Sequence, residues 1–127
     1  MRCGPAANQF GEFLVRNLYD ESIDYFDLLV KGHWKAPSTL PLQDALKQFS
    51  AEQIKVIRDA LINSLGAGLH RVLFALDELG EDSTEMAVMV EGVNVLSQSD
   101  GLHGETFGED GWMAKYSKHP AYFINHS

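Results

Sequence analysis

The stretch from Ser50 to Gly80 is the longest run of helical periodicity in the sequence, and it constrains the fold most. Its apolar residues recur at steps of three and four, which places them on one face of a helix. They are Ile54, Ile57, Leu61, Leu65, Leu69, Val72, Leu73, Leu76 and Leu79. A second apolar series falls on another face and consists of Val56, Ala60, Ala67 and Phe74. Because both faces need cover, the pattern predicts a central helix packed on two sides.

Local signals place the ends of this helix. Ser50 can act as its N-cap, because a serine side chain accepts a hydrogen bond from an unpaired backbone N–H of the first turn. Gln53, three residues later, can bond back to the Ser50 N–H and complete a capping box. Gly80 is a typical residue for the C-terminal end. The sequence therefore predicts a helix from 50 to 80.

Gly66 and Gly68 are unusual inside this helix, because each mid-helix glycine costs about 1 kcal/mol relative to alanine. Such glycines indicate either a close crossing or kink against another element, or space left for a ligand beside His70. The sequence leaves both interpretations open.

The charge of the chain bears on its partners. The 127 residues carry a formal charge of −8, from 18 acidic and 10 basic side chains. This charge argues against a nucleic-acid partner, because phosphate binding needs a clustered positive surface. An acidic surface instead attracts basic partners. The length fits one domain, 1–127, that can bury a core of its own.

The cellular compartment of the protein is predicted from sequence features that are missing. No apolar run approaches the roughly 18 residues that a membrane span requires. Residues 1–8 lack the apolar stretch of a signal peptide. Cys3 is the one cysteine, so no disulfide can form within the chain. These features predict a cytoplasmic protein with no membrane partner.

Two further helices are expected before the central one. Residues 1–8 predict a flexible, extended arm. Helical spacing of apolar residues then runs from 9 to 31, with a polar section near Asp20 where the helix could bend. A short helix begins near Pro41 and leads directly into the central helix. The helical part of the chain is thus predicted to span 9–80.

Residues 86–117 predict an antiparallel meander of four short strands, separated by turns rich in glycine and acidic residues. The alternation of Trp112, Ala114 and Tyr116 with Met113 and Lys115 is the period expected of its last strand. Residues 118–127 form a tail. The predicted fold class is therefore α+β, with three N-terminal helices packed on a C-terminal antiparallel four-stranded meander.

The stretch from Asp100 to Trp112 is the most function-like part of the sequence, because it combines acids, a histidine, an aromatic ring and four glycines. On a strand, His103 and Glu105 would point to the same face, where a carboxylate could orient the imidazole for general-base work. Acids and glycines are equally common in solvated turns. Asp100, His103, Glu105 and Trp112 are therefore candidate binding residues, and no catalytic residue is assigned.

Metal binding is a weaker hypothesis. His33, His70 and His103 could converge if the end of the first helix, the central helix and the third strand meet. The sequence contains no paired ligand spacing such as HExxH or CxxC, and no nucleophile or nucleotide-binding motif. We therefore expect no metal and no cofactor, and retain His33 and His70 as binding candidates.

Two other features have both a structural and a functional interpretation. Trp34, in a loop bounded by prolines, is either a core side chain or a binding anchor. The acids of the helix 9–31 form either a solvated face or a docking surface for a basic protein. These acids are Glu12, Asp20, Glu21, Asp24 and Asp27.

Several phrases resemble small uncharacterised bacterial proteins, some of them carried by mobile elements. The phrases are FDLL at 26–29, GHWKAP at 32–37, SDGLHGE at 99–105 and DGW at 110–112. The resemblance covers most of the chain and implies a small stand-alone accessory protein. It implies no activity and no catalytic residue.

The sequence therefore predicts a non-enzymatic, acidic accessory protein that binds a macromolecular partner, as an immunity or antitoxin protein would. The partner would be a basic protein. The alternative is a small-molecule-binding protein or small enzyme with a pocket between the central helix and the sheet. A third interpretation is a homodimer that joins through a helix face or a sheet edge.

Overall fold

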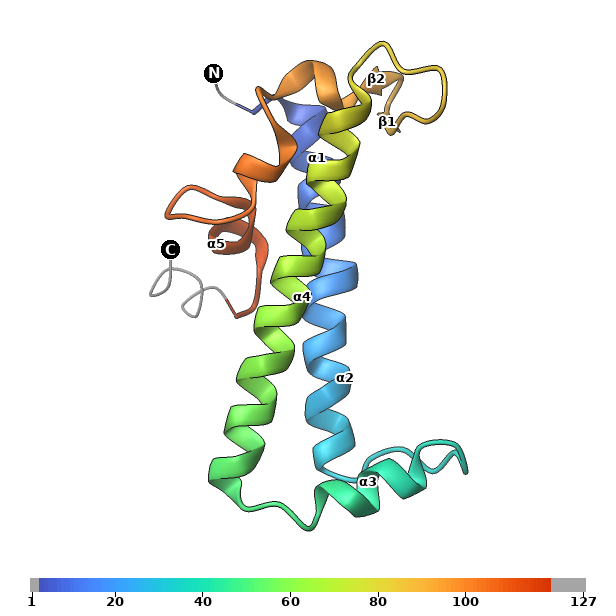
Figure 1. The fold of residues 1–127 in the computed structure, drawn as a ribbon, viewed down its shortest axis with the longest axis vertical. Coiled ribbons are helices and arrows are strands. Elements are labelled where there is room, and N and C mark those ends of the chain that lie inside the picture. The colour runs from blue at the N-terminus through green and yellow to red at the C-terminus, as the bar shows by residue number, and fades with distance from the viewer. Residues whose placement is uncertain (1–2, 120–127) are drawn as a thin grey trace.

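Two long helices that run antiparallel and side by side form the framework of the protein in a computed structural model, which describes residues 3–119 (Figure 1). The first consists of α1 (Pro5–Leu14), the π-helical segment η1 (Val15–Asp20) and α2 (Glu21–Val30), which follow one another without a break. The second is α4 (Ala51–Leu79). We call this pair the helical hairpin.

The remaining elements are short. The helix α3 (Leu40–Leu46) lies at the turn of the hairpin (Figure 1). After α4 come β1 (Met89–Val90), β2 (Val93–Asn94), the 3₁₀ turns η2 (Val95–Gln98) and η3 (Leu102–Glu105), and α5 (Trp112–Tyr116). We call residues 95–119 the C-terminal segment. It returns along one flank of the hairpin, where η3 packs on α4 and α5 packs on α1 and η1.

The predicted signals at the start of α4 are confirmed. The Gln53 N–H donates to Ser50 Oγ at 3.1 Å, and the Ser50 N–H donates to Gln53 Oε1 at 2.8 Å. This is the reciprocal pair of a capping box. The helix ends before Gly80, which has a φ of 81°.

Residues 3–8 do not form the extended arm that the sequence predicts. The helix α1 starts at Pro5, where a missing N–H does no harm. Gln98 of η2 binds this helix start, because its side-chain Oε1 accepts from the Ala6 N–H at 2.6 Å and its backbone oxygen accepts from the Gly4 N–H at 2.8 Å. The N-terminal turn is thus held by a residue more than ninety positions away.

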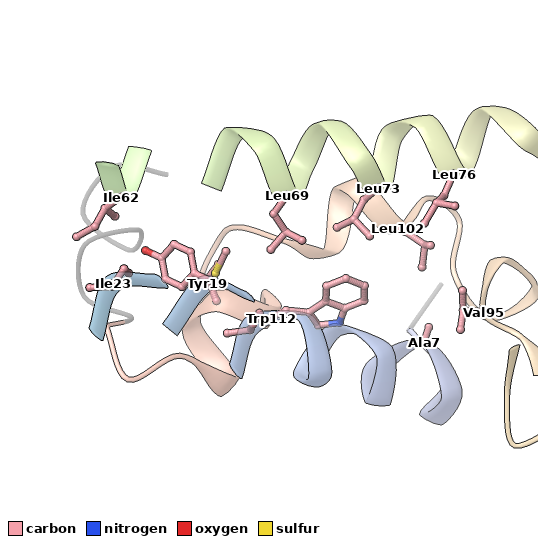
Figure 2. Close-up of a cluster of buried hydrophobic side chains, with 12 residues drawn as sticks. Ala7, Tyr19, Ile23, Ile62, Leu69, Leu73, Leu76, Val95, Leu102 and Trp112 are labelled. Atoms are coloured by element: carbon pink, nitrogen blue, oxygen red, sulfur yellow. The ribbon is translucent and has the colours of Figure 1, made fainter. Parts of the chain in front are cut away.

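The core lies between the helical hairpin and the C-terminal segment (Figure 2). Buried apolar side chains from both long helices, η2, η3 and α5 meet there. They are Ala7, Val15, Tyr19, Ile23, Ile62, Leu69, Leu73, Leu76, Val95, Leu102, Trp112 and Met113. Burial of this apolar surface is the main force that holds the segment onto the hairpin.

Trp112 is the largest side chain in this core and is only 1% exposed. Its ring packs directly on α1 at Gly11, where a Cβ atom would lie 2.2 Å from ring atom Cδ2. Only glycine leaves room for this contact. The indole Nε1–H donates to Asn8 Oδ1 at 3.0 Å, so the polar edge of the buried ring is satisfied.

The helix α4 is covered on one side only, which contradicts the expectation of cover on two. Its inward residues are buried against the first long helix and the C-terminal segment. The second apolar series is exposed, with Val56 at 68% and Phe74 at 36%, and Ala60 and Ala67 also lie on the surface. Within residues 3–119, the side of α4 that carries Val56, Ala60 and Ala67 is thus left exposed, whereas Phe74 of the same series contacts the His103 ring.

The predicted α+β fold with a four-stranded meander is wrong. Within residues 3–119 the sheet consists of β1 and β2 alone, which pair antiparallel with Met89 opposite Asn94 and Val90 opposite Val93. A glycine-containing turn after the first strand is present, as predicted, but it consists of Glu91 and Gly92 alone, and the second strand begins already at Val93. Glu91 and Gly92 both have positive φ, 50° and 81°, as a type I′ hairpin turn requires.

The two later predicted strands are helical turns instead. Residues 102–105 form η3, and residues 112–116 form α5. Trp112 and Met113 are adjacent and both are buried, which differs from the alternation expected of a strand with one buried face. The apparent alternation misleads because five residues are too few to separate a period of 2 from one of 3.6.

Among the described residues, no helix has both the length and the apolar character needed to cross a membrane.

Replacement of Gly11 by alanine tests the contact between α1 and Trp112. The added methyl group would force the indole ring out of its place, so we expect Gly11→Ala to lower the free energy of unfolding by at least about 2 kcal/mol. Urea denaturation followed by circular dichroism measures this change.

Gly68→Ala is the matched control, because a Cβ at Gly68 would meet nothing within 4 Å. It should leave stability unchanged or raise it by up to about 1 kcal/mol. Equal effects of the two substitutions would contradict the role given to Gly11.

Candidate functional site

The candidate site lies where η3 packs on the C-terminal part of α4. Its central group is the Asp77 carboxylate, which accepts the backbone N–H of Leu102 at 2.8 Å and of His103 at 3.0 Å. The first N–H groups of a helical turn have no partner within the turn, so a carboxylate from another helix supplies one. Asp77 therefore fixes the position of η3 and of the residues around it.

The His103 ring is held by the same carboxylate. Its Nδ1 lies 2.6 Å from Asp77 Oδ2. An ionised carboxylate can only accept, so Nδ1 carries the hydrogen and Nε2 is left as the second ring nitrogen. The ring also contacts His70 edge-on, with centroids 5.4 Å apart, and Phe74 at 5.2 Å. The imidazole is thus fixed in orientation, while its side chain remains 37% exposed.

A shallow depression of about 310 Å³ opens beside this ring. It is lined by Ser99, Asp100, Gly101, His103, Gly104 and Glu105. Glu105 Oε2 accepts from Ser99 Oγ at 3.0 Å, and Ser99 Oγ in turn accepts from the Gly101 N–H at 3.1 Å. The depression therefore places two carboxylates and one imidazole around a short glycine-containing loop.

Cys3 lies beside Glu105. Burial, followed by a hydrogen bond to the Glu105 carboxylate, raises the pKa of its thiol to about 12. The thiol therefore stays protonated at physiological pH, and the thiolate is the reactive form. The contact links the N-terminal turn to η3.

Charge is strongly segregated along the chain. Residues 72–114 contain ten of the 18 acidic residues and no lysine or arginine. The basic residues of the described chain lie in η1, in α4 and in the connections on either side of α3, or at Lys115 and Lys118. The segment that lines the depression thus contains no basic residue, although Lys115 lies close enough to act electrostatically on the Cys3 thiol beside Glu105.

Four of the predicted site residues meet at this place. Asp100, His103 and Glu105 line the depression, and His70 contacts the His103 ring. The proposed pairing of His103 with Glu105 does not occur, because residues 102–105 form a 3₁₀ turn and the two side chains point to different partners. The partner of His103 is Asp77, which sequence reasoning missed.

A signal for Asp77 was nevertheless present in the sequence. It follows Leu69 and Leu73 at steps of four on the inward face of α4. Its side chain is only 16% exposed. A carboxylate on a buried helical face must find donors, so its position alone indicated a polar contact inside the fold.

The other candidates lie elsewhere. Trp112 is a core residue, and His33 and Trp34 belong to the loop 31–39 between α2 and α3, a segment at the turn of the hairpin (Figure 1). Trp34 is half-buried, and its backbone exchanges two hydrogen bonds with the side-chain amide of Gln43, at 2.9 and 2.8 Å. The three histidines considered for a metal therefore do not converge. No group of three His, Cys, Asp or Glu side chains within residues 3–119 is arranged to hold a metal ion.

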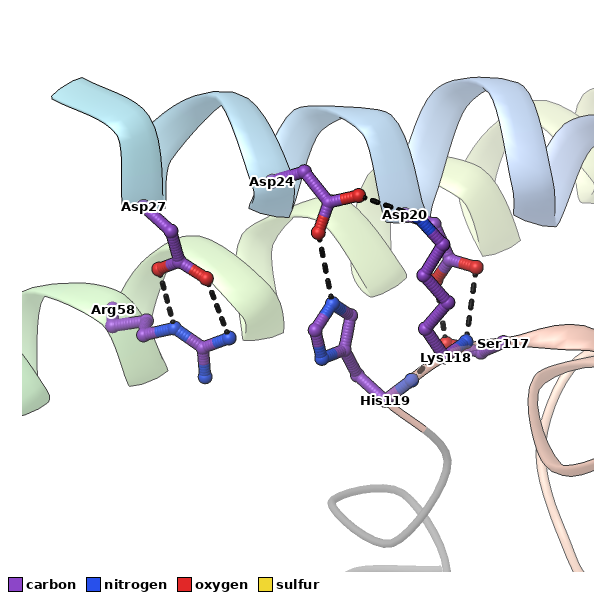
Figure 3. Close-up of polar contacts among 7 residues, drawn as sticks. All are labelled: Asp20, Asp24, Asp27, Arg58, Ser117, Lys118 and His119. Atoms are coloured by element: carbon purple, nitrogen blue, oxygen red, sulfur yellow. Dashed lines mark hydrogen bonds and ion pairs between the residues drawn. The ribbon is translucent and has the colours of Figure 1, made fainter. Parts of the chain in front are cut away.

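The acids of α2 and η1 bind the chain itself (Figure 3). Asp20 is 1% exposed and accepts from Ser117 Oγ at 2.6 Å and from the Lys118 N–H at 3.0 Å. Asp24 accepts from Lys118 Nζ at 2.8 Å, and its other oxygen lies 3.4 Å from His119 Nε2. The start of the predicted tail is therefore fixed on the first long helix, and residues 120–127 lie outside the described part.

Asp27 completes this row of acids. Its two oxygens accept from Arg58 Nε at 2.8 Å and from Arg58 Nη2 at 3.1 Å, which is a bidentate pair between the two long helices. The hydrogen bond to Asp27 raises the pKa of the Arg58 guanidinium. A row of carboxylates that is occupied in this way is not a free docking surface.

Comparisons with protein-family models, with curated proteins and with solved structures give no match to this chain. The site therefore has to be interpreted from its own chemistry.

Loss of the Asp77 carboxylate should detach η3. Asp77→Ala removes the acceptor of two backbone N–H groups and one ring N–H, and hydrogen bonds to a charged group are worth more than neutral ones. We expect a loss of about 2 to 3 kcal/mol in the free energy of unfolding. Glu78→Ala, one residue away on the exposed surface, should change it by less than about 0.5 kcal/mol.

The buried and exposed acids of α2 and η1 should differ in their effect. Asp20→Ala removes a buried carboxylate that accepts from the Ser117 hydroxyl and the Lys118 N–H, so we expect a loss of about 2 to 3 kcal/mol in the free energy of unfolding. Asp24→Asn should cost several-fold less, because exposed ion pairs are screened by water. Urea titrations of both variants provide the comparison, and equal losses would argue against Asp20 as the anchor.

The contribution of Asp24 should also depend on pH. Hydrogen bonding to Lys118 lowers the pKa of the Asp24 carboxyl below its ordinary 3.8. Its stabilisation is therefore complete above the ordinary pKa and is lost as the pH falls through the lowered value. The stability difference between the wild type and Asp24→Asn should be constant near neutral pH and vanish in strong acid.

Proposed function

We propose that this protein is a non-enzymatic binding protein, of the kind to which immunity and antitoxin proteins belong, and that its partner is a basic macromolecule. The observation that carries the proposal is the depression beside η3, where Asp100, Glu105 and the fixed ring of His103 surround a glycine loop. A lysine or arginine side chain of the partner fits this chemistry, because its cation can donate to two carboxylates.

The surroundings of the depression support the same partner. Residues 72–114 bring a concentration of negative charge without a single basic residue, which raises the association rate of a positively charged protein. A Cβ at Gly104 would meet nothing within 4 Å, so the loop is open to close approach by another backbone. Docking is thus proposed at η3 and not on the acids of α2, which the chain itself occupies.

Glu105 can accept a further donor without giving up its present contacts. A carboxylate has about four lone-pair positions, and the bonds from Ser99 and Cys3 use part of them. Ser99 and Cys3 also hold the carboxylate in place before a partner arrives. Such preorganisation lowers the entropy cost of binding.

A cytoplasmic location is part of the proposal. The lone thiol of Cys3 is held in its protonated form and suits a reducing compartment. Nucleic acid is not proposed as a partner, because the depression and its surroundings carry the wrong charge.

A hexa-arginine peptide tests the proposal by NMR titration. We expect the peptide to shift the backbone amide signals of Gly101 and Gly104, and the double variant Asp100→Asn/Glu105→Gln to weaken its binding at least fivefold. The matched control, Glu85→Gln/Glu91→Gln, removes the same charge from exposed positions outside the depression and should weaken binding by less than twofold. Equal weakening by both pairs would show diffuse attraction to net charge and would overturn the proposed site.

A second candidate function is acid–base chemistry on a small molecule, and one observation favours it. The short contact between His103 Nδ1 and Asp77 Oδ2 orients the imidazole as in a general base, with Nε2 directed away from the carboxylate. The two functions separate in the variant His103→Gln. It would abolish catalysis, whereas binding of the arginine peptide would fall much less than in Asp100→Asn/Glu105→Gln.

A further inference from the structure

His103 is the one histidine among the residues that line the depression at η3. Its side chain is 37% exposed, so both solvent and a docked partner can reach the ring. Imidazole is the side chain whose charge ordinarily changes between pH 5 and 8. The wall of the depression therefore contains a group that can change its charge within the physiological range of pH.

The ring is held on several sides, which fixes where that charge would lie. Asp77 Oδ2 lies 2.6 Å from Nδ1, and the same carboxylate is itself held by two backbone N–H groups of η3. The rings of His70 and Phe74 contact the imidazole from α4. On the loop side, a Cβ at Gly101 would lie 3.3 Å from His103 Cε1, so the ring lies directly against this residue.

The charged and titratable groups around the ring are mostly acidic. They are Asp77 and His70 on α4, Asp100 and Glu105 in the lining, and, further out, Arg71 over the Phe74 ring and Lys115 near Cys3. The lining itself consists of residues 99–101 and 103–105, which include no lysine or arginine. Within this lining, protonation of His103 is thus the one way to add a positive charge.

The two protonation states of the ring treat a cation in opposite ways. In the neutral ring, Nδ1 donates to Asp77 and Nε2 has a lone pair that can accept a further hydrogen bond. In the protonated ring both nitrogens are donors, and the ring carries a positive charge. Protonation therefore removes an acceptor and places a cation in the wall of the site.

We propose that protonation of His103 releases the basic partner from the depression, so that binding at η3 weakens as the pH falls from about 7.5 to about 5.5. The inference rests on the proposed function, since it concerns the same site and the same cationic partner. The imidazolium repels the cation of the partner and competes with it for the carboxylates of Asp100 and Glu105.

Asp77 makes the response direct. The contact between Nδ1 and Oδ2 persists on protonation and becomes a hydrogen bond between two charged groups, which is stronger than the neutral form. The ring is therefore not expected to turn out into solvent when it becomes charged. The positive charge stays beside the bound cation, and η3 keeps its conformation.

His70 is the other imidazole that could respond to pH near this site. Its ring stacks on Phe107 with centroids 6.0 Å apart, and it is not part of the lining of the depression. Two adjacent imidazoles also oppose each other's protonation, because the second positive charge is repelled by the first. Exposure within the lining assigns the response to His103.

NMR titration with the hexa-arginine peptide at pH 7.5 and 5.5, at constant ionic strength, tests the proposal. The peptide keeps its charge at both values, because arginine does not deprotonate in this range. We expect the dissociation constant of the wild type to rise about fivefold or more at the lower pH, the order of effect of two unit charges a few ångströms apart at a wet surface.

His103→Asn removes the titrating ring and keeps an amide that can donate to Asp77. Its ratio of dissociation constants between the two pH values should fall below about twofold, whatever its affinity at pH 7.5. His70→Asn and, as the matched control at the turn of the hairpin, His33→Asn should keep the wild-type ratio. A ratio that survives in His103→Asn, or is lost in His70→Asn, would overturn the assignment to His103.

The ring signals of His103 provide a reciprocal measurement. If protonation weakens binding about fivefold, saturating peptide must lower the midpoint of the His103 titration by about 0.7 pH units, because coupling is equal in both directions. Binding with equal affinity at both pH values and an unmoved midpoint would overturn this inference and leave the proposed function intact. Absence of peptide binding at pH 7.5 would overturn both.

Discussion

The contact between the Trp112 ring and the backbone of α1 at Gly11 holds the protein together as one body. A helical hairpin alone buries one stripe of each helix, and it leaves both flanks open to water. The indole ring closes one flank by lying directly against α1, and the residues around it bring η2, η3 and α5 into the same core. A side chain at position 11 would displace the indole ring and thereby disturb the packing of all these elements together.

Polar contacts then fix the C-terminal segment at defined points along that flank. Gln98 binds the start of α1, Asp77 binds η3, and Asp20 binds the backbone and side chain at 117–118. Each joins residues far apart in the sequence. The segment after α4 has little regular structure, and these single buried or partly buried acceptors fix its path. Any other path would leave their donors unpaired, which is destabilising away from water.

The sequence predicted the parts of this fold that depend on local periodicity. The capping box at Ser50, the long helix that follows, and the turn at Glu91–Gly92 all need only neighbouring residues, and all are present. The prediction of a four-stranded meander was wrong because short segments such as 112–116 take their conformation from the core that they enter. Asp77 was missed for a related reason, since its partners come from a turn whose backbone direction no local pattern gives.

The π-helical segment η1 has a consequence for how the chain tolerates length changes. It accommodates one residue more than an α-helix would over the same rise, so Tyr19 and Asp20 both face inward although they are consecutive. Deletion of one residue between 15 and 20 would therefore restore a regular α-helix and leave α1 and α2 in nearly the same relative orientation. A deletion within α1 or α2 would instead rotate the residues before it by about 100°, and one in α2 would turn Gly11 away from the indole ring.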